Sequence, residues 1–144
     1  MANSVEERLR RLEDAEEIRL LLTDYVRLLD AYDLPAYAAL FAREGEWTGP
    51  YVGSARGPQA ILELMRTHLR PGSRGAHHIV SNMVVEVEGD RGSAWSRWTY
   101  VVPGADGAPS LAVSGRYDDR LVRENGRWRF AARIVAGDLN APVQ

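Results

Sequence analysis

Apolar residues recur at helical spacing along the first thirty positions of the chain. They return every three or four residues, as is typical of an amphipathic helix, at Leu9, Leu12, Ile18, Leu21, Leu22, Tyr25, Val26 and Leu29. Ser4 followed by Glu7 has the form of a capping box and predicts where this helix begins. Its opening turns carry only a narrow apolar stripe, whereas its later turns are apolar over much of their circumference. The pattern therefore predicts that the second half of the helix is buried.

Two shorter helices are predicted next. The second helix begins after Asp33, which is a suitable N-cap, and ends near Arg43. A third helix opens at residues 57–58, where Gly precedes Pro, and the Pro-Gly pair at residues 71–72 stops it. Between these two helices we expect a short strand at residues 46–48 and a loop over residues 49–57.

The rest of the chain changes character. β-branched and aromatic residues alternate there with turn signals, which indicates strands joined by hairpins. We expect four strands, over residues 77–88, 93–102, 111–123 and 128–135. Asn125-Gly126 is the strongest hairpin signal, because both residues accept the positive φ of a type I′ turn. Three helices followed by these strands predict an α+β fold, with helices packed on a curved antiparallel sheet and a concave pocket between the two layers.

Composition narrows the range of functions. A length of 144 residues with 45% hydrophobic content suits a single domain, over residues 1–144, with one core. The formal charge of -2, with basic residues interleaved among acids, gives no footprint for nucleic acid. The absence of cysteine excludes thiol catalysis and disulfides. We find no signal-peptide pattern and no apolar run of the about 18–20 residues that span a membrane, so a cytoplasmic protein with a small-molecule partner is expected.

Motifs for metals and nucleotide cofactors are missing from the sequence. Only His68, His77 and His78 offer nitrogen ligands, and the adjacent pair points to opposite faces of a strand. Neither a glycine-rich dinucleotide motif nor a phosphate-binding loop follows a predicted strand. We therefore expect a reaction that needs no cofactor and no metal.

Two residues are suited to acid–base chemistry. Asp30 follows an apolar stretch at the predicted end of the first helix, where it either faces the pocket or caps the helix. His78 lies at the start of the first long strand beside His77, and strand alternation does not decide which of the two faces inward. An imidazole has a reference pKa of about 6.5, and a carboxylate on its second nitrogen fixes its tautomer. Such a pair can remove an acidic C–H proton or protonate a leaving hydroxyl.

Several segments, in order, resemble the SnoaL-like branch of the nuclear-transport-factor-2-like superfamily. They run from about Glu16 to Arg133 and comprise residues 18–33, 40–42, 57–61, 77–82, 89–90, 115–119 and 126–128. The resemblance implies a conical α+β fold with a deep pocket. This superfamily includes scytalone dehydratase, steroid isomerases, polyketide cyclases and a bile-acid dehydratase, and also noncatalytic subunits, so the fold alone does not fix the function.

The resemblance also implies roles for single residues. Asp30 and His78 match the acidic partner and the general acid/base of the catalytic pair in the dehydratases. Tyr25 matches the tyrosine of a Tyr–Asp pair, although five residues on a helix separate two side chains by about 140° and a core role stays equally open. The chain departs from scytalone dehydratase in having Leu29 before the acid and no second strand histidine near Ser96. Dehydration of that particular substrate is therefore not implied.

Further side chains are candidates for substrate binding. The aromatic ones either line a pocket for a flat ligand or belong to the core, and the small polar ones point either inward or outward. These candidates are Trp47, Tyr51, Asn82, Ser96, Trp98 and Tyr117. Arg133 is expected to face away from the pocket, because alternate residues over 128–134 form the apolar side of its strand.

Three functions remain open. The first is a cofactor-independent dehydratase, isomerase or cyclase that acts on a hydrophobic, cyclic, carbonyl-containing molecule through Asp30 and His78. The second is a noncatalytic small-molecule-binding protein or accessory subunit. The third is a dimerisation module whose own aromatic residues fill the pocket. A homo-oligomer, either a dimer or a trimer, is expected because Trp95, Thr99 and Val101 lie on an outer strand face.

Overall fold

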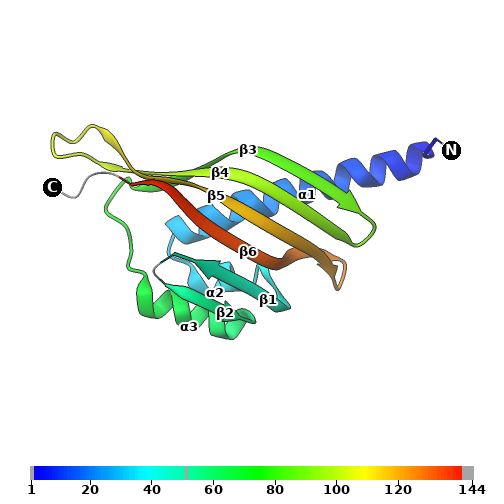
Figure 1. Cartoon of the computed structure of the whole chain (residues 1–144), viewed down its shortest axis with the longest axis horizontal. Helices are drawn as coiled ribbons and strands as arrows, with labels where there is room; N and C mark the ends of the chain where they lie inside the picture. Colours follow the sequence, from blue (N-terminus) through cyan, green and yellow to red (C-terminus); the bar gives the residue numbers. More distant parts are fainter. Residues whose placement is uncertain (1, 51, 141–144) are drawn as a thin grey trace.

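The computed structural model describes residues 2–50 and 52–140, and within them it has three helices and six strands. The helices are α1 (Val5–Asp30), α2 (Leu34–Ala38) and α3 (Pro58–His68). The strands are β1 (Phe41–Gly49), β2 (Gly53–Arg56), β3 (His77–Glu88), β4 (Arg91–Pro103), β5 (Pro109–Glu124) and β6 (Arg127–Asn140). They form one sheet in the order β2-β1-β6-β5-β4-β3 (Figure 1).

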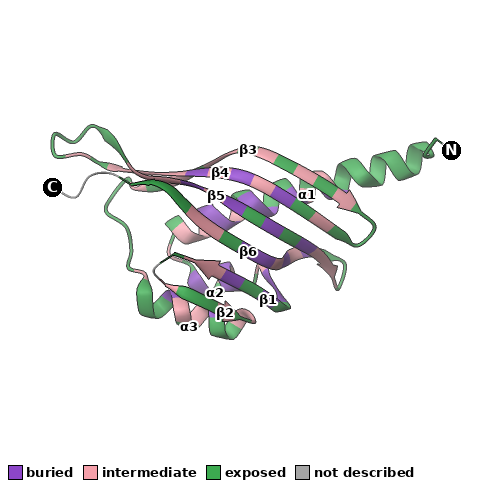
Figure 2. Cartoon of the chain, in the orientation of Figure 1, coloured by how far each residue is buried: buried purple, intermediate pink, exposed green. Residues whose placement is uncertain are grey.

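Helix α1 begins and is buried as the sequence predicts. The Ser4 hydroxyl accepts the Glu7 backbone N–H at 3.1 Å, and the Glu7 carboxylate accepts the Ser4 N–H at 2.8 Å. The first turns project beyond the sheet and are exposed, whereas Ile18 and Leu22 are fully buried against it (Figure 2). In the part of the chain that the structure describes, no helix is both long and apolar enough to cross a membrane.

All three helices lie on one face of the curved sheet. Helix α1 runs along β3 and reaches β6, while α2 and α3 pack together near the β1–β2 end (Figure 1). The core fills the space between α1 and the sheet and is rich in aromatic rings, among them Tyr25, Tyr37 and Phe130. This layering confirms the expected α+β class.

The sheet is mixed, and in this respect the expectation of an antiparallel sheet is wrong. Strand β1 runs parallel to β6, with Trp47 opposite Arg133. Within the segment predicted as a loop, β2 folds back antiparallel on β1, with Ala55 opposite Trp47. Both pairings depend on tertiary packing. The local pattern of apolar and polar residues along the chain therefore does not predict them.

Helix α2 is shorter than predicted and ends at Ala38. The Leu40 carbonyl accepts the Phe130 backbone N–H at 3.0 Å, so the chain has already joined β6 at this point. The Arg43 backbone N–H donates a hydrogen bond to the Glu124 carboxylate at 3.1 Å. Pairing with β6 and with the end of β5 therefore replaces the last predicted turn of the helix.

A bulge in β6 reverses the alternation of its side chains. The register with β5 skips one residue at Ala131. Before the bulge Phe130 faces the helices, and after it Arg133 does, with both residues fully buried. Ile134 is consequently 52% exposed on the outer face. The prediction that Arg133 faces away is wrong for this reason.

The outer face of the sheet carries exposed apolar residues. Val84, Trp95, Asp118 and Ile134 lie in one row across four strands, and Val84 is 55% exposed. Self-association through this face stays a prediction.

Candidate active site

Asp30 and His78 lie side by side although 48 residues separate them in the chain. Asp30 is the last residue of α1, and His78 is the second residue of β3. One carboxylate oxygen of Asp30 lies 2.6 Å from His78 Nδ1, and the other accepts the His78 backbone N–H at 2.9 Å. The side chains are 21% and 17% exposed. The structure thus brings together the two residues that the sequence singles out.

This geometry determines which ring nitrogen is available. With Nδ1–H donated to the Asp30 carboxylate, Nε2 of His78 is left to take or give a proton. The carboxylate also stabilises the imidazolium that forms when Nε2 accepts a proton. The pair is therefore suited to general-base catalysis, with His78 as the base and the Asp30 carboxylate as the group that orients its ring.

A cavity of about 220 Å³ opens beside the pair. Its wall includes Leu29, Leu69 and Tyr100 together with Asp30 and His78. Since an apolar cavity of about 150 Å³ holds benzene, this volume suits a single-ring molecule. A larger groove of about 420 Å³ lies between the first turns of α1 and the β3–β4 turn, but its wall contains no histidine.

His77 points away from this cavity. Its side chain is exposed, and Nδ1 lies 2.9 Å from the Gly75 carbonyl oxygen. The His78 ring instead packs against Tyr100, with the ring centres 4.5 Å apart. Of the two adjacent histidines, His78 is therefore the one at the cavity.

Tyr25 lies deeper, in the aromatic interior. Its hydroxyl oxygen accepts hydrogen bonds from Trp47 Nε1 at 2.9 Å and from the Tyr37 hydroxyl at 2.7 Å. Burial raises the pKa of Tyr25 above its ordinary value, despite the opposing effect of Arg133. Tyr25 is absent from the wall of the cavity beside His78. The structure therefore brings Tyr25 together with Trp47, another candidate, but not with Asp30.

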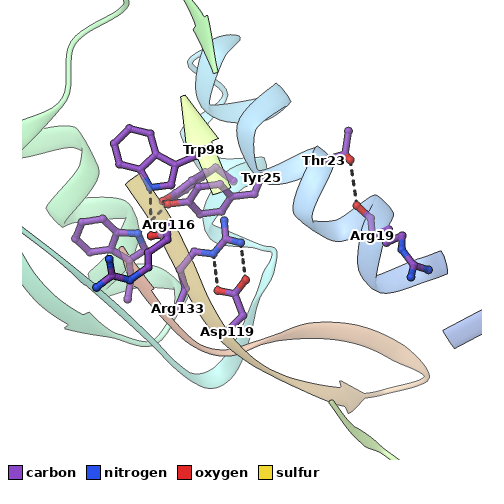
Figure 3. A network of polar contacts seen from close by, with 9 residues as sticks. Arg19, Thr23, Tyr25, Trp98, Arg116, Asp119 and Arg133 are labelled. Atoms are coloured by element: carbon purple, nitrogen blue, oxygen red, sulfur yellow. Dashed lines mark hydrogen bonds and ion pairs between the residues drawn. The ribbon is translucent and has the colours of Figure 1, made fainter. Parts of the chain in front are cut away.

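Trp98 and Tyr117 form an aromatic wall behind the pair. The Trp98 ring centre is 6.1 Å from that of His78 and 5.9 Å from that of Tyr117, on which it stacks. Trp98 Nε1 donates to the Arg116 carbonyl at 3.2 Å, which fixes the indole (Figure 3). Both rings are buried and belong to the core cluster.

The remaining candidates are scattered. Ser96 is fully buried in β4, and its hydroxyl has no hydrogen-bond partner among the described residues. Asn82 has a φ of 53° at the point where the register between β3 and β4 shifts. Tyr51 lies outside the described residues. Within the described residues, none of the predicted substrate-binding candidates lines the cavity beside His78.

Arg133 and Asp119 form a buried ion pair that strand alternation did not predict. Their side chains are fully buried, and two parallel hydrogen bonds of 2.7 Å join them (Figure 3). The guanidinium carbon lies 3.8 Å from the Tyr117 ring centre and 4.0 Å from that of Tyr25. Nη1 of Arg133 has no partner in the described part of the chain. A cation thus lies directly behind the aromatic wall.

The two members of this pair respond differently to burial. Burial acts to lower the pKa of Arg133, but Asp119 outweighs it, so the pKa is raised and the guanidinium stays charged. Burial raises the pKa of Asp119 above its ordinary range, and the bonds from Arg133 offset only part of that rise. The apolar rings around the pair exclude water and so account for the burial effect on each pKa, whereas the net rise of the Arg133 pKa comes from Asp119.

Comparison with known sequences identifies a protein family that matches this chain. A family model described as a SnoaL-like domain matches residues 10–134. The γ-hexachlorocyclohexane dehydrochlorinase of Sphingobium indicum is 25% identical over 134 residues, which cover 92% of this chain and 86% of that enzyme. An enzyme that eliminates hydrogen chloride, as its name states, is thus among the relatives.

Solved structures share the fold. A nuclear-transport-factor-2-like protein with a cystatin-like fold from Novosphingobium aromaticivorans is 28% identical, with a TM-score of 0.80 over 92% of this chain and 87% of that one. The structure of LinA gives the same TM-score of 0.80 at 23% identity, over 94% of this chain and 92% of that one. These matches confirm the expected fold of helices on a curved sheet.

Proposed function

Because the chain belongs to the SnoaL-like domain family, we propose that it is a cofactor-independent acid–base enzyme of the dehydratase, isomerase or cyclase type. Its substrate is a hydrophobic, cyclic, carbonyl-containing small molecule. His78 transfers the proton, and Asp30 orients the ring and stabilises its charged form. The dehydrochlorinase relatives remove hydrogen chloride, as their name states, and the hydrogen lost in such a reaction comes from a C–H bond.

One observation carries this proposal. The Asp30 carboxylate lies 2.6 Å from His78 Nδ1, directly beside a cavity of about 220 Å³. A proton-transferring group must lie within hydrogen-bond reach of its substrate, and Nε2 of an imidazole fixed in this way can reach a ligand in that cavity.

The proposed reaction begins at a carbon next to a carbonyl group. The C–H bond breaks, its proton moves to His78 Nε2, and its electron pair forms an enolate on the substrate oxygen. In an isomerisation the proton returns to another carbon, and in a dehydration it leaves with a hydroxyl group as water. A positioned acid–base group of this kind contributes about 10²–10⁴-fold to such a rate.

The apolar part of the cavity wall supports a hydrophobic substrate. Leu29 and Leu69 line the cavity beside the Tyr100 ring, so a ring placed there is removed from water. Burial of apolar surface gives about 25 cal/mol per Å², which supplies affinity without a directional contact.

The test measures proton removal directly. Single-ring ketones are incubated with the protein in D₂O, and NMR follows deuterium exchange at the carbon next to the carbonyl. We expect the protein to accelerate exchange for at least one ketone and His78→Ala to abolish that acceleration. His77→Ala, which alters the adjacent exposed histidine, serves as the matched control and keeps it.

A second candidate is a noncatalytic ligand-binding protein, since Leu29, Leu69 and Tyr100 give the cavity a wall that can hold a ring without any reaction. Such a protein would bind the ketones and would accelerate no exchange. The same NMR samples, which report line broadening of the ligand as well as exchange, separate the two functions.

A further inference from the structure

The segment that forms the rim of the cavity is positively charged. Residues 64–85 contain Arg66, Arg70 and Arg74 and no aspartate or glutamate, in a chain whose formal charge is -2. The segment runs from the last turns of α3 through the connecting loop into β3 (Figure 1). It supplies a large share of the cavity wall, including Leu69. The cavity wall is therefore continuous with a segment of net positive charge.

Arg70 is the arginine of this segment that lines the cavity. Its Nη1 donates to the carbonyls of Leu69 at 2.8 Å and Arg66 at 3.3 Å, so the guanidinium is held at the end of α3. Across residues 2–50 and 52–140, no carboxylate lies within 4 Å of the guanidinium, and neither Nε nor Nη2 has a hydrogen-bond partner. The charge is thus held in place without being neutralised.

The rim is tied to the element that carries the acid–base pair. The Tyr32 hydroxyl, two residues beyond Asp30, donates to the Leu69 carbonyl at 3.0 Å. At Gly72 a Cβ would lie 2.7 Å from the Tyr100 hydroxyl oxygen, so the loop passes close to the end of that side chain. These two contacts set the position of Arg70 relative to Asp30.

We infer that the cavity takes a single-ring molecule that bears a carboxylate, bound by Arg70 at the rim with the ring directed toward His78. This inference rests on the proposed function and specifies its substrate class. The planar Nε–Nη2 edge of an arginine matches the two oxygens of a carboxylate. Both oxygens of Asp30 already accept hydrogen bonds from His78, whereas the Nε–Nη2 edge of Arg70 has no partner among the described residues.

The test compares benzoate with its neutral counterpart benzamide, two rings of nearly equal size. Binding of each is measured by isothermal titration to the wild-type protein, Arg70→Gln, Arg70→Lys and Arg74→Gln. The wild type should bind benzoate about tenfold more tightly than benzamide, as a charge-assisted contact provides. Arg70→Gln should remove this preference, and Arg70→Lys should keep part of it. Arg74→Gln, the matched control in the same segment, should keep all of it.

Three results would overturn the inference: equal binding of the two ligands, no binding of either, or an equal loss in Arg74→Gln and Arg70→Gln. The last would assign the preference to the general charge of the rim. Failure of the proposed function can be told apart from failure of this inference. It would appear as a deuterium exchange rate of the ketones that is the same in the wild type and in His78→Ala. The benzoate preference is measured on the wild-type protein and on Arg70 variants, so it does not depend on that exchange.

Discussion

The Asp30 carboxylate makes two hydrogen bonds to His78, one to ring Nδ1 at 2.6 Å and one to the backbone N–H at 2.9 Å. The second bond fixes the end of α1 to the start of β3, and the first sets the tautomer of the imidazole. One side chain therefore joins the two layers of the fold and prepares the ring for proton transfer.

Removal of the Asp30 charge should weaken catalysis more than folding. In Asp30→Asn the amide still reaches the backbone N–H, but it no longer stabilises an imidazolium. We expect the ketone exchange rate to fall at least about tenfold. Nitrogen-15 NMR of the ring should show His78 protonated at Nδ1 in the wild type and a mixture of tautomers in the variant. An unchanged exchange rate would remove Asp30 from the mechanism.

Tyr25→Phe should chiefly lower stability. The substitution leaves Trp47 Nε1 and the Tyr37 hydroxyl without an acceptor in a buried site, which costs about 1–3 kcal/mol. Urea unfolding measures this loss, and Tyr100→Phe, whose hydroxyl makes no hydrogen bond within the described residues, is the control. A large loss of ketone exchange with unchanged stability would instead establish the catalytic role predicted for Tyr25 from the resemblance.

Arg133→Met should destabilise the protein strongly. It leaves the Asp119 carboxylate buried without its partner, and breaking a buried pair in this way costs about 3–5 kcal/mol. Replacing both residues, as Arg133→Met with Asp119→Leu, should cost less than the single change at Arg133, because no unpaired charge remains. Urea unfolding compares the two variants. If the double variant is less stable than Arg133→Met alone, the ion pair contributes more to the stability of the fold than the mutual neutralisation of two buried charges.

The stability contributed by Asp14 should disappear in acid. Burial acts to raise the pKa of Asp14, but hydrogen bonds from Trp128 Nε1 at 3.1 Å and Arg123 at 2.7 Å outweigh it, and the pKa is lowered. A carboxylate with a lowered folded-state pKa stabilises the fold above its unfolded pKa of about 3.9 and loses this effect as the pH falls through the folded value.

Melting temperatures from pH 7 to pH 2.5 check this expectation. The difference between wild type and Asp14→Asn should be constant down to about pH 4 and should shrink below it. Asp24→Asn, which removes an exposed carboxylate on the same helix, is the control and should show a small difference throughout. A difference for Asp14→Asn that persists to pH 2.5 would contradict the assignment.

Local patterns were sufficient for much of the fold. The apolar spacing and the Ser4–Glu7 capping box predicted α1 and its buried half, and the turn signals predicted the four long strands. Asp30 and His78 followed from a resemblance, and the structure places them in contact. These features depend on residues close in sequence or on a shared order of motifs.

Features set by distant contacts were not predictable. The parallel pairing of β1 with β6 and the return of β2 depend on which strands meet in the folded chain. The bulge at Ala131 carries no turn residue, yet it turns Arg133 from the outer face into the core. Trp98 and Tyr117 stack on each other in the interior, and no residue pattern reports whether such rings leave a cavity beside them.

The most direct test of the central claim is the ketone exchange rate of the double variant Asp30→Asn, His78→Ala beside the two single variants. Residues that act as one unit show strongly non-additive losses. We expect the double variant to be no slower than His78→Ala alone, because Asp30 acts through the ring. Losses that multiply, or full activity in His78→Ala, would contradict it.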